Sequence, residues 1–186
     1  VELLDRAESH SLLMTALERE TSPIAAAAML RAAARRPSEA VVDAAFRWLE
    51  TADPSEAAIE ALLACARSEF LPPGPKRDRL RQFLESEHPV SRTQNALMLA
   101  VVIGDSDRVA HLLKSNEREL VLAAANALAE RESGLGALLA AAMEDPQLFD
   151  AAMRGLRRFQ VSAEGLAIAQ RLPTGNQVRK DESLRA

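Results

Sequence analysis

The sequence predicts an all-α protein, an α-solenoid in which pairs of helices stack one upon the next. Hydrophobic residues make up 48% of the 186-residue chain and aromatic residues only 3%, so the apolar content is mostly Ala and Leu. These two residues have high helix propensity, whereas the residue types that favour strands are scarce. Two further observations support the prediction: helix-start signals recur about every 30 residues, and the second half of the chain repeats itself.

Five helices are expected in the first half of the chain. Their approximate ranges are 2–19, 23–35, 38–51, 54–70 and 76–86. Ser22-Pro23 and Asp53-Pro54 mark two of the starts, because Ser or Asp caps free amides and Pro suits the first helical position. The segment "LPPGP" (71–75) interrupts the helical pattern, since three prolines and a glycine cannot continue a helix. We interpret it as a long loop inside one repeat, with a hinge between two halves as the alternative.

The second half aligns to itself without gaps at an interval of 28 residues. His88-Pro89, Asn116 and Asp145-Pro146 are predicted to start the first helices of three pairs, and the second helices are expected near 106–114, 134–143 and 163–171. The matching columns hold mostly small residues and Leu: Asn95/Ala123/Ala151, Ala96/Ala124/Ala152, Leu99/Ala127/Gly155, Ala100/Leu128/Leu156, Val109/Ala137/Gly165, Ala110/Leu138/Leu166 and Leu112/Ala140/Ile168. Such helices cannot bury their apolar faces alone, but stacked copies form a continuous core.

The repeating segments resemble a known family. "DPQLFDAAMRGLRRF" (145–159) and, more loosely, "NERELVLAAANALAER" (116–131) with "GLGALLAAAMED" (134–145) are similar to the short HEAT-like repeats, also called phycobilin-lyase-type HEAT repeats. The resemblance covers residues 88–172 well and 22–87 loosely. It implies a right-handed superhelical stack whose second, shorter helices line the concave side.

One family feature differs in this chain. The Arg that often follows the apolar position is replaced by Thr93, Val121 and Phe149, which implies a weaker ladder of Asp/Arg contacts between repeats. The resemblance implies an architecture rather than one function, because this repeat class serves protein–protein scaffolds, chromophore lyases and some DNA-repair glycosylases.

The domain expectation is one repeat domain over 1–172, with 88–172 as its clearest part, followed by a flexible tail over 173–186 where the apolar period is lost. The chain opens with Val1 and shows no signal-peptide pattern, so we expect a piece of a longer protein. No apolar run approaches the roughly 20 residues that cross a bilayer. A single cysteine, Cys65, cannot form an internal disulfide, which indicates a reducing, cytoplasmic setting.

Residues with catalytic or metal-binding chemistry are few. Cys65 lies on an apolar helix and is interpreted as a buried small hydrophobe. His10, His88 and His111 lack metal-ligand spacing, and neither a phosphate loop nor a hydrolase motif occurs. We therefore expect no enzyme, no cofactor and no metal site. Trp48 is expected in the core or an end cap, and would be an interface anchor if it were exposed.

Two basic clusters are the candidate partner-binding residues: Lys76, Arg77, Arg79 and Arg81 in "KRDRLR", and Arg154 and Arg158, which share a helix face at i and i+4. Residues 1–75 hold 7 Lys and Arg against 12 Asp and Glu, whereas residues 76–186 hold 16 against 15. This polarity suits a charged partner. The alternative interpretation is a solvated face with local ion pairs.

The function expected from these observations is a non-enzymatic scaffold that binds another protein, a peptide or the remainder of its own longer chain. A net charge of −4 and the scarcity of aromatic residues count against nucleic-acid binding. Two alternatives from other classes remain: a HEAT-like nucleic-acid-binding or DNA-repair glycosylase module, and a chromophore lyase or chaperone-like helper.

Overall fold

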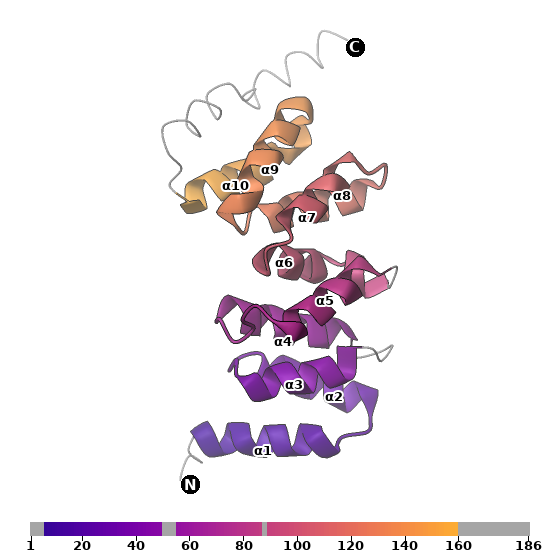
Figure 1. The fold of residues 1–186 in the computed structure, drawn as a ribbon, viewed down its shortest axis with the longest axis vertical. Coiled ribbons are helices and arrows are strands. Elements are labelled where there is room, and N and C mark those ends of the chain that lie inside the picture. Colours follow the sequence, from indigo (N-terminus) through magenta and orange to yellow (C-terminus); the bar gives the residue numbers. More distant parts are fainter. Residues whose placement is uncertain (1–5, 50–54, 87–88, 160–186) are drawn as a thin grey trace. The chain divides into compact units, whose positions relative to one another are not determined.

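The computed structural model describes residues 6–49, 55–86 and 89–159, and all regular secondary structure in these ranges is helical (Figure 1). The chain divides into two compact units, residues 1–103 and 104–186, which are considered separately. The first unit contains α1 (Arg6–Arg19), α2 (Pro23–Ala33), α3 (Glu39–Leu49), α4 (Ser55–Arg67), α5 (Pro75–Glu85), the 3₁₀ helix η1 (Pro89–Arg92) and α6 (Gln94–Val102). The second contains α7 (Ser106–His111), η2 (Leu112–Lys114), α8 (Arg118–Leu128), α9 (Glu132–Glu144), η3 (Pro146–Leu148) and α10 (Phe149–Phe159). The all-α prediction is confirmed for the described residues.

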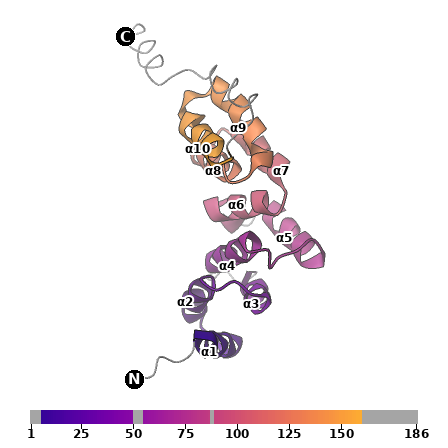
Figure 2. The ribbon, with the colours of Figure 1, turned by 90° about the vertical axis from the view of Figure 1, so that its left-hand side faces the viewer.

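Each unit has two layers of helices. In the first unit α2 packs on α4 and α4 on α6, while α3 and α5 lie together on the other side (Figure 2). In the second unit α8 contacts α10 in one layer and α7 contacts α9 in the other. The helices of one layer are the predicted first helices of the pairs, and those of the other are the predicted second helices.

The core is made mainly of Ala and Leu side chains, as the composition predicts. Leu30, Ile59, Leu62, Leu99 and Leu128 are completely buried, each on a helix of the first layer. Burying one such side chain stabilises the fold by about 1.5–3 kcal/mol before entropic costs. Trp48 is also buried, which confirms its predicted place in the core.

Polar contacts between neighbouring helices of a layer repeat at chain distances of 27 to 29 residues. In the second unit Ser106 bonds Ser133 at 2.9 Å and Arg158 pairs with Glu130 at 3.0 Å. The same spacing occurs elsewhere in His10–Ser38, Arg31–Glu60, Arg118–Asp145 and Arg154–Asn126, and in the bond from Arg47 to the carbonyl of Glu18. The interval found by aligning the sequence therefore corresponds to contacts made by the folded chain.

Arg118 provides an inter-helix contact that the sequence comparison did not anticipate. Val121 stands where the family often has Arg, but Arg118, one turn earlier, pairs with Asp145 and also donates to Gln147. A contact of the Asp/Arg type is thus present between α8 and the start of the next helix.

The predicted helix starts are partly confirmed. Ser22 caps α2 by accepting from the amide of Ala25, with Pro23 at the first helical position. Asp145 caps η3 by accepting from the amide of Gln147 at 3.0 Å. Asp53-Pro54 and His88 lie outside the described residues, as do the helix expected at 163–171 and the tail at 173–186.

Two predicted starts are wrong in detail. Pro89 begins η1 rather than an α-helix, and α6 starts only after Thr93, whose side chain accepts from the amide of Ala96. Asn116 is not a cap: Glu117 precedes α8, and the hydroxyl of Ser115 accepts from the Glu117 amide at 3.1 Å. In both places a nearby Thr or Ser hydroxyl takes the role, because these hydroxyls readily accept from free backbone amides.

The chain between α4 and α5 is non-helical up to Gly74, and Pro75 is the first residue of α5. The end of α4 forms a Schellman turn in which Phe70 donates its amide to the carbonyl of Cys65 at 2.9 Å and Glu69 donates to Ala66. Glu69 has a φ of +65°, a conformation that usually requires Gly or Asn. Residues 68–74 connect two helices within the first unit, which agrees with the interpretation as a loop inside a repeat.

Glycine permits a close approach of helices in the second unit. A Cβ atom added at Gly155 would lie 2.8 Å from Cδ1 of Leu135, and one at Gly134 would lie 2.8 Å from the carbonyl oxygen of Leu128. The small-residue column that contains Gly155 therefore marks a tight contact between α10 and α9. Gly136, two residues after Gly134 in the same helix, has open space around its Cα.

Two substitutions in α9 are expected to change stability in opposite directions. Gly134→Ala should destabilise the protein by about 1–3 kcal/mol, because the new methyl group meets backbone that cannot move aside easily. Gly136→Ala should stabilise it by about 0.5–1 kcal/mol, since Ala loses less entropy than Gly in a helix. Urea unfolding followed by circular dichroism at 222 nm measures both. Equal effects of the two substitutions would contradict the close packing described at Gly134.

The Asp145–Arg118 pair predicts a pH dependence of stability. The hydrogen bond from Arg118 lowers the pKa of Asp145 below its usual value of 3.8, and the amide of Gln147 acts in the same direction. The stabilisation is therefore present above pH 3.8 and lost as the pH falls through the lowered pKa. Asp145→Asn should cost up to about 1 kcal/mol at pH 7, a modest value because the pair is partly exposed. The difference between wild type and variant should disappear near pH 2 in urea titrations; a difference that persists there would contradict the charge argument.

Candidate functional site

The four basic residues predicted near residue 80 lie on α5, but they separate into two pairs. Lys76 and Arg79 are exposed and point towards α3: Lys76 forms an ion pair with Asp43, and the guanidinium of Arg79 lies 5.7 Å from the centre of the Phe46 ring. These contacts place both cations over the surface between the second-layer helices α3 and α5.

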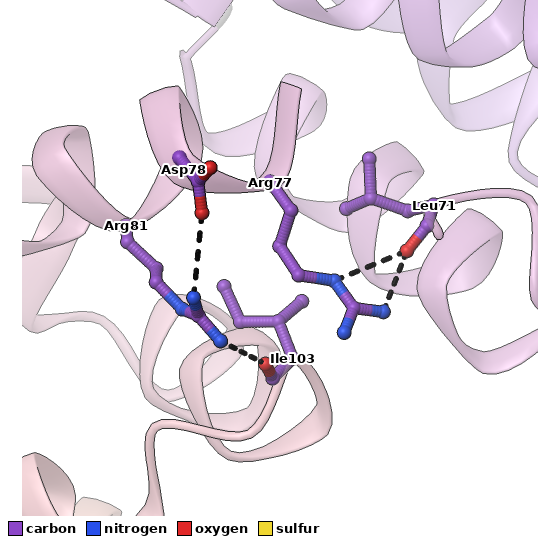
Figure 3. A network of polar contacts seen from close by, with 5 residues as sticks. All are labelled: Leu71, Arg77, Asp78, Arg81 and Ile103. Atoms are coloured by element: carbon purple, nitrogen blue, oxygen red, sulfur yellow. Dashed lines mark hydrogen bonds and ion pairs between the residues drawn. The ribbon is translucent and has the colours of Figure 1, made fainter. Parts of the chain in front are cut away.

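Arg77 and Arg81 are half-buried and hold the backbone in place (Figure 3). Arg77 donates to the carbonyl of Leu71 through Nε at 3.2 Å and Nη2 at 2.6 Å. Arg81 donates to the carbonyl of Ile103, at the end of α6, at 3.0 Å and also contacts Asp78 at 3.4 Å. Since a free carbonyl at a helix end needs a partner, Arg81 completes the end of α6. Both residues therefore have a structural role, whatever else they contact.

The sequence contains a signal that separates these pairs. Arg77, Leu80, Arg81 and Leu84 follow the i, i+3, i+4, i+7 spacing of one helix face, and both leucines are completely buried or nearly so. The two arginines on this face extend along the packed side of α5, whereas Lys76 and Arg79 lie off it. Treating "KRDRLR" as one cluster overlooked this periodicity.

A cationic pocket of about 340 Å³ lies between α3 and α5, and we call it the α3–α5 pocket. Its lining consists of Asp43, Phe46, Arg47, Lys76 and Arg79. Three cations thus surround one carboxylate, and Phe46, which is only 7% exposed, forms part of the floor. Arg47 is a member that sequence reasoning missed. It precedes Lys76 by 29 residues, so the repeat interval would have brought the two together.

A second, mostly apolar pocket of about 390 Å³ adjoins the first, because Lys76 lines both. We call it the Phe70 pocket. Its other lining residues are Glu39, Val42, Phe70, Leu71, Pro72, Pro73, Gly74 and Pro75. Phe70 is 40% exposed, whereas Val42 and Leu71 are almost completely buried and form the base. The two pockets give the first unit a surface with apolar and cationic parts side by side.

The candidate cations of the second unit, Arg154 and Arg158, are engaged between helices. Arg154 donates to the side-chain oxygen of Asn126, and Arg158 pairs with Glu130 at 3.0 Å. Because both the arginines on α10 and their partners on α8 are four residues apart, the contacts form two matched steps. These cations stitch α10 to α8, and the structure does not bring them into a pocket that it describes.

A groove of about 680 Å³ lies between α7 and α9, the second-layer helices of the second unit. Its apolar lining is Ala110, Leu113, Ala137, Ala140, Ala141 and Leu148, and its polar lining is Asp107, His111, Lys114, Glu144 and Asp145. The Ser106–Ser133 hydrogen bond joins the N-terminal ends of the two helices. In both units a hollow therefore lies between successive second-layer helices.

The remaining candidates do not form a chemical site. Cys65 is fully buried and its thiol contacts the carbonyl of Ser38 at 3.8 Å; burial raises the pKa of the thiol above its usual value. His10 lies 3.5 Å from the hydroxyl of Ser38, and His111 lies at the α7–α9 groove. Among the residues with described positions, no group of three or more His, Cys, Asp or Glu is arranged to hold a metal ion.

Comparison with other proteins adds no assignment. No protein-family model matches the sequence, and neither the curated proteins nor the solved structures contain a significant match. Within the described part of the chain, none of the helices combines the length and apolar character needed to cross a membrane.

The state of Cys65 can be checked by thiol labelling. Because the side chain is buried and its raised pKa keeps it protonated, 5,5′-dithiobis(2-nitrobenzoate) at pH 8 should label the native protein at least about 100-fold more slowly than the urea-unfolded protein. As the pH rises past 9.0, the unfolded thiol ionises first and stability should decrease. Rapid labelling of the native protein would contradict the buried position.

Proposed function

We propose that this protein is a helical-repeat scaffold, an α-solenoid of HEAT-like helix pairs, that binds a protein or peptide through the surface of its second-layer helices. Support comes from the two layers in each unit and from polar contacts that recur every 27 to 29 residues. Stacked repeats commonly present an extended surface made by one helix of each pair.

The observation that carries this proposal is the position of the hollows. The α3–α5 pocket, the Phe70 pocket and the α7–α9 groove are all lined by second-layer helices or the turns next to them. Side chains there are exposed without closing the space between adjacent helices, as expected of a surface that receives another chain. The α3–α5 pocket also concentrates positive charge in the part of the chain that is otherwise acidic.

The nucleic-acid or glycosylase alternative finds the required residue types in one place but not in the required state. A base-excision site needs a carboxylate beside an aromatic face that can stack on a base. Asp43 is paired with Lys76, and Phe46 is buried beneath Arg79. A tetrapyrrole lyase or helper role has no supporting geometry among the described residues, and absorption of the purified protein tests it directly.

The binding test uses charge reversal at the exposed cations only. We expect Lys76→Glu with Arg79→Glu to weaken capture of the partner from cell lysate roughly tenfold and to lower the salt concentration at which it elutes. Reversing Arg77 and Arg81 as well would remove hydrogen bonds to backbone carbonyls, so that fourfold variant would confuse loss of binding with loss of structure. Quantitative mass spectrometry of a salt-gradient elution gives the measurement.

A matched control is Arg19→Glu with Arg35→Glu, which changes the net charge equally on exposed residues of the first unit outside both pockets. The control should retain the partner. Equal capture by wild type and by the Lys76/Arg79 variant would argue against an electrostatic role of the α3–α5 pocket. Nuclease-sensitive nucleic acid in the eluate would instead favour the nucleic-acid alternative.

A further inference from the structure

The loop that forms the Phe70 pocket is held in a defined shape. The amide of Phe70 is bonded to Cys65, and the carbonyl of Leu71 accepts two bonds from Arg77 (Figure 3). Gly74 has a φ of +148°, which few other residues adopt, and the prolines on either side restrict the backbone further. A surface fixed in this way loses little conformational entropy when a ligand binds.

The rim of this pocket exposes apolar groups that the fold does not require at the surface. Phe70 is 40% exposed, and Pro72, Pro73 and Pro75 are all exposed around it. Contiguous exposed apolar groups on a soluble protein often mark an interaction site. With a base of Val42 and Leu71 and a volume of about 390 Å³, the pocket has room for one large apolar side chain.

The neighbouring charges select the kind of partner. Lys76 lines both pockets, so a chain bound in the Phe70 pocket continues over the α3–α5 pocket with its three cations. Arg47 donates only to the neutral carbonyl of Glu18 at 3.0 Å, which leaves its charge uncompensated by that contact. Lys76 pairs with Asp43 through one of the three donors that a lysine ammonium has. Carboxylates next to an apolar residue fit this arrangement, whereas a basic peptide would meet like charge.

We propose that the Phe70 pocket and the α3–α5 pocket together bind an acidic peptide segment of a partner protein. A large apolar side chain enters the Phe70 pocket, and Asp or Glu residues within a few positions of it lie over Arg47, Lys76 and Arg79. This inference rests on the proposed scaffold function and specifies its ligand: the apolar side chain supplies the anchor and the carboxylates set the direction in which the segment lies.

The test begins with a ligand selected without assumptions about its sequence. A random 12-residue peptide library displayed on phage is panned against the full chain, with prior depletion on the Phe70→Ser variant. We expect the enriched peptides to carry Leu, Ile, Met or Phe with Asp or Glu within three positions. The most enriched peptide, labelled with fluorescein, is then titrated with the protein by fluorescence anisotropy.

Substitutions separate the two parts of the site. Phe70→Ser should weaken binding at least tenfold at all salt concentrations, because it removes an exposed apolar wall. Lys76→Gln with Arg79→Gln should weaken it about tenfold at low salt and less at high salt, because salt screens the charges. Leu122→Ser is the matched control: Leu122 is 39% exposed and belongs to the second unit, so this variant should bind like wild type.

Three results would overturn the inference: no enrichment of any peptide, enrichment of basic peptides, or binding that Phe70→Ser leaves unchanged in a variant with a wild-type circular dichroism spectrum. The failure of the broader proposal is distinguishable. If lysate capture depends on Lys76 and Arg79 but not on Phe70, the scaffold function stands and the apolar-anchor inference falls. If capture depends on none of them, the second-layer surface of the first unit is not the binding site.

Discussion

Close packing of helices through small side chains is the constraint on which the rest of this structure depends. Ala and Gly allow helix backbones to approach until the leucines between them are fully buried, as at Gly155 against Leu135. A helix with so few large side chains buries enough apolar area only if it is covered on more than one side. The repetition of helix pairs is thus a requirement for stability in such a sequence, and surfaces between second-layer helices follow from it.

The same repetition determines which charged residues are available to a partner. Side chains at the repeat interval meet across neighbouring helices, so Arg118, Arg154 and Arg158 contact polar groups of the adjacent pair. Lys76 and Arg79 lie beyond a longer connection, and the Lys76–Asp43 pair spans 33 residues instead of 27 to 29. The added residues displace α5 along the chain and give its cations a different neighbourhood.

Composition and periodicity predicted the helical class, most of the helix boundaries and the buried positions of Cys65 and Trp48, because burial in helices depends on local spacing. They did not separate Arg77 and Arg81 from Lys76 and Arg79, since adjacent letters were grouped by charge rather than by helix face. Arg47 was missed because its proximity to α5 depends on tertiary packing. The starts at Thr93 and Glu117 show that a hydroxyl a few residues away can replace the expected cap.

The loop from 68 to 74 separates recognition from stability within one short stretch. Its attachment to the fold uses backbone groups, the Phe70 amide and the Leu71 carbonyl, rather than the side chains that face solvent. Side chains on its outer surface can therefore be exchanged while the anchoring bonds and the helices around them remain. A protein built this way can acquire a new ligand preference through changes in a few exposed loop residues, and a designer can graft other short motifs there without redesigning the core.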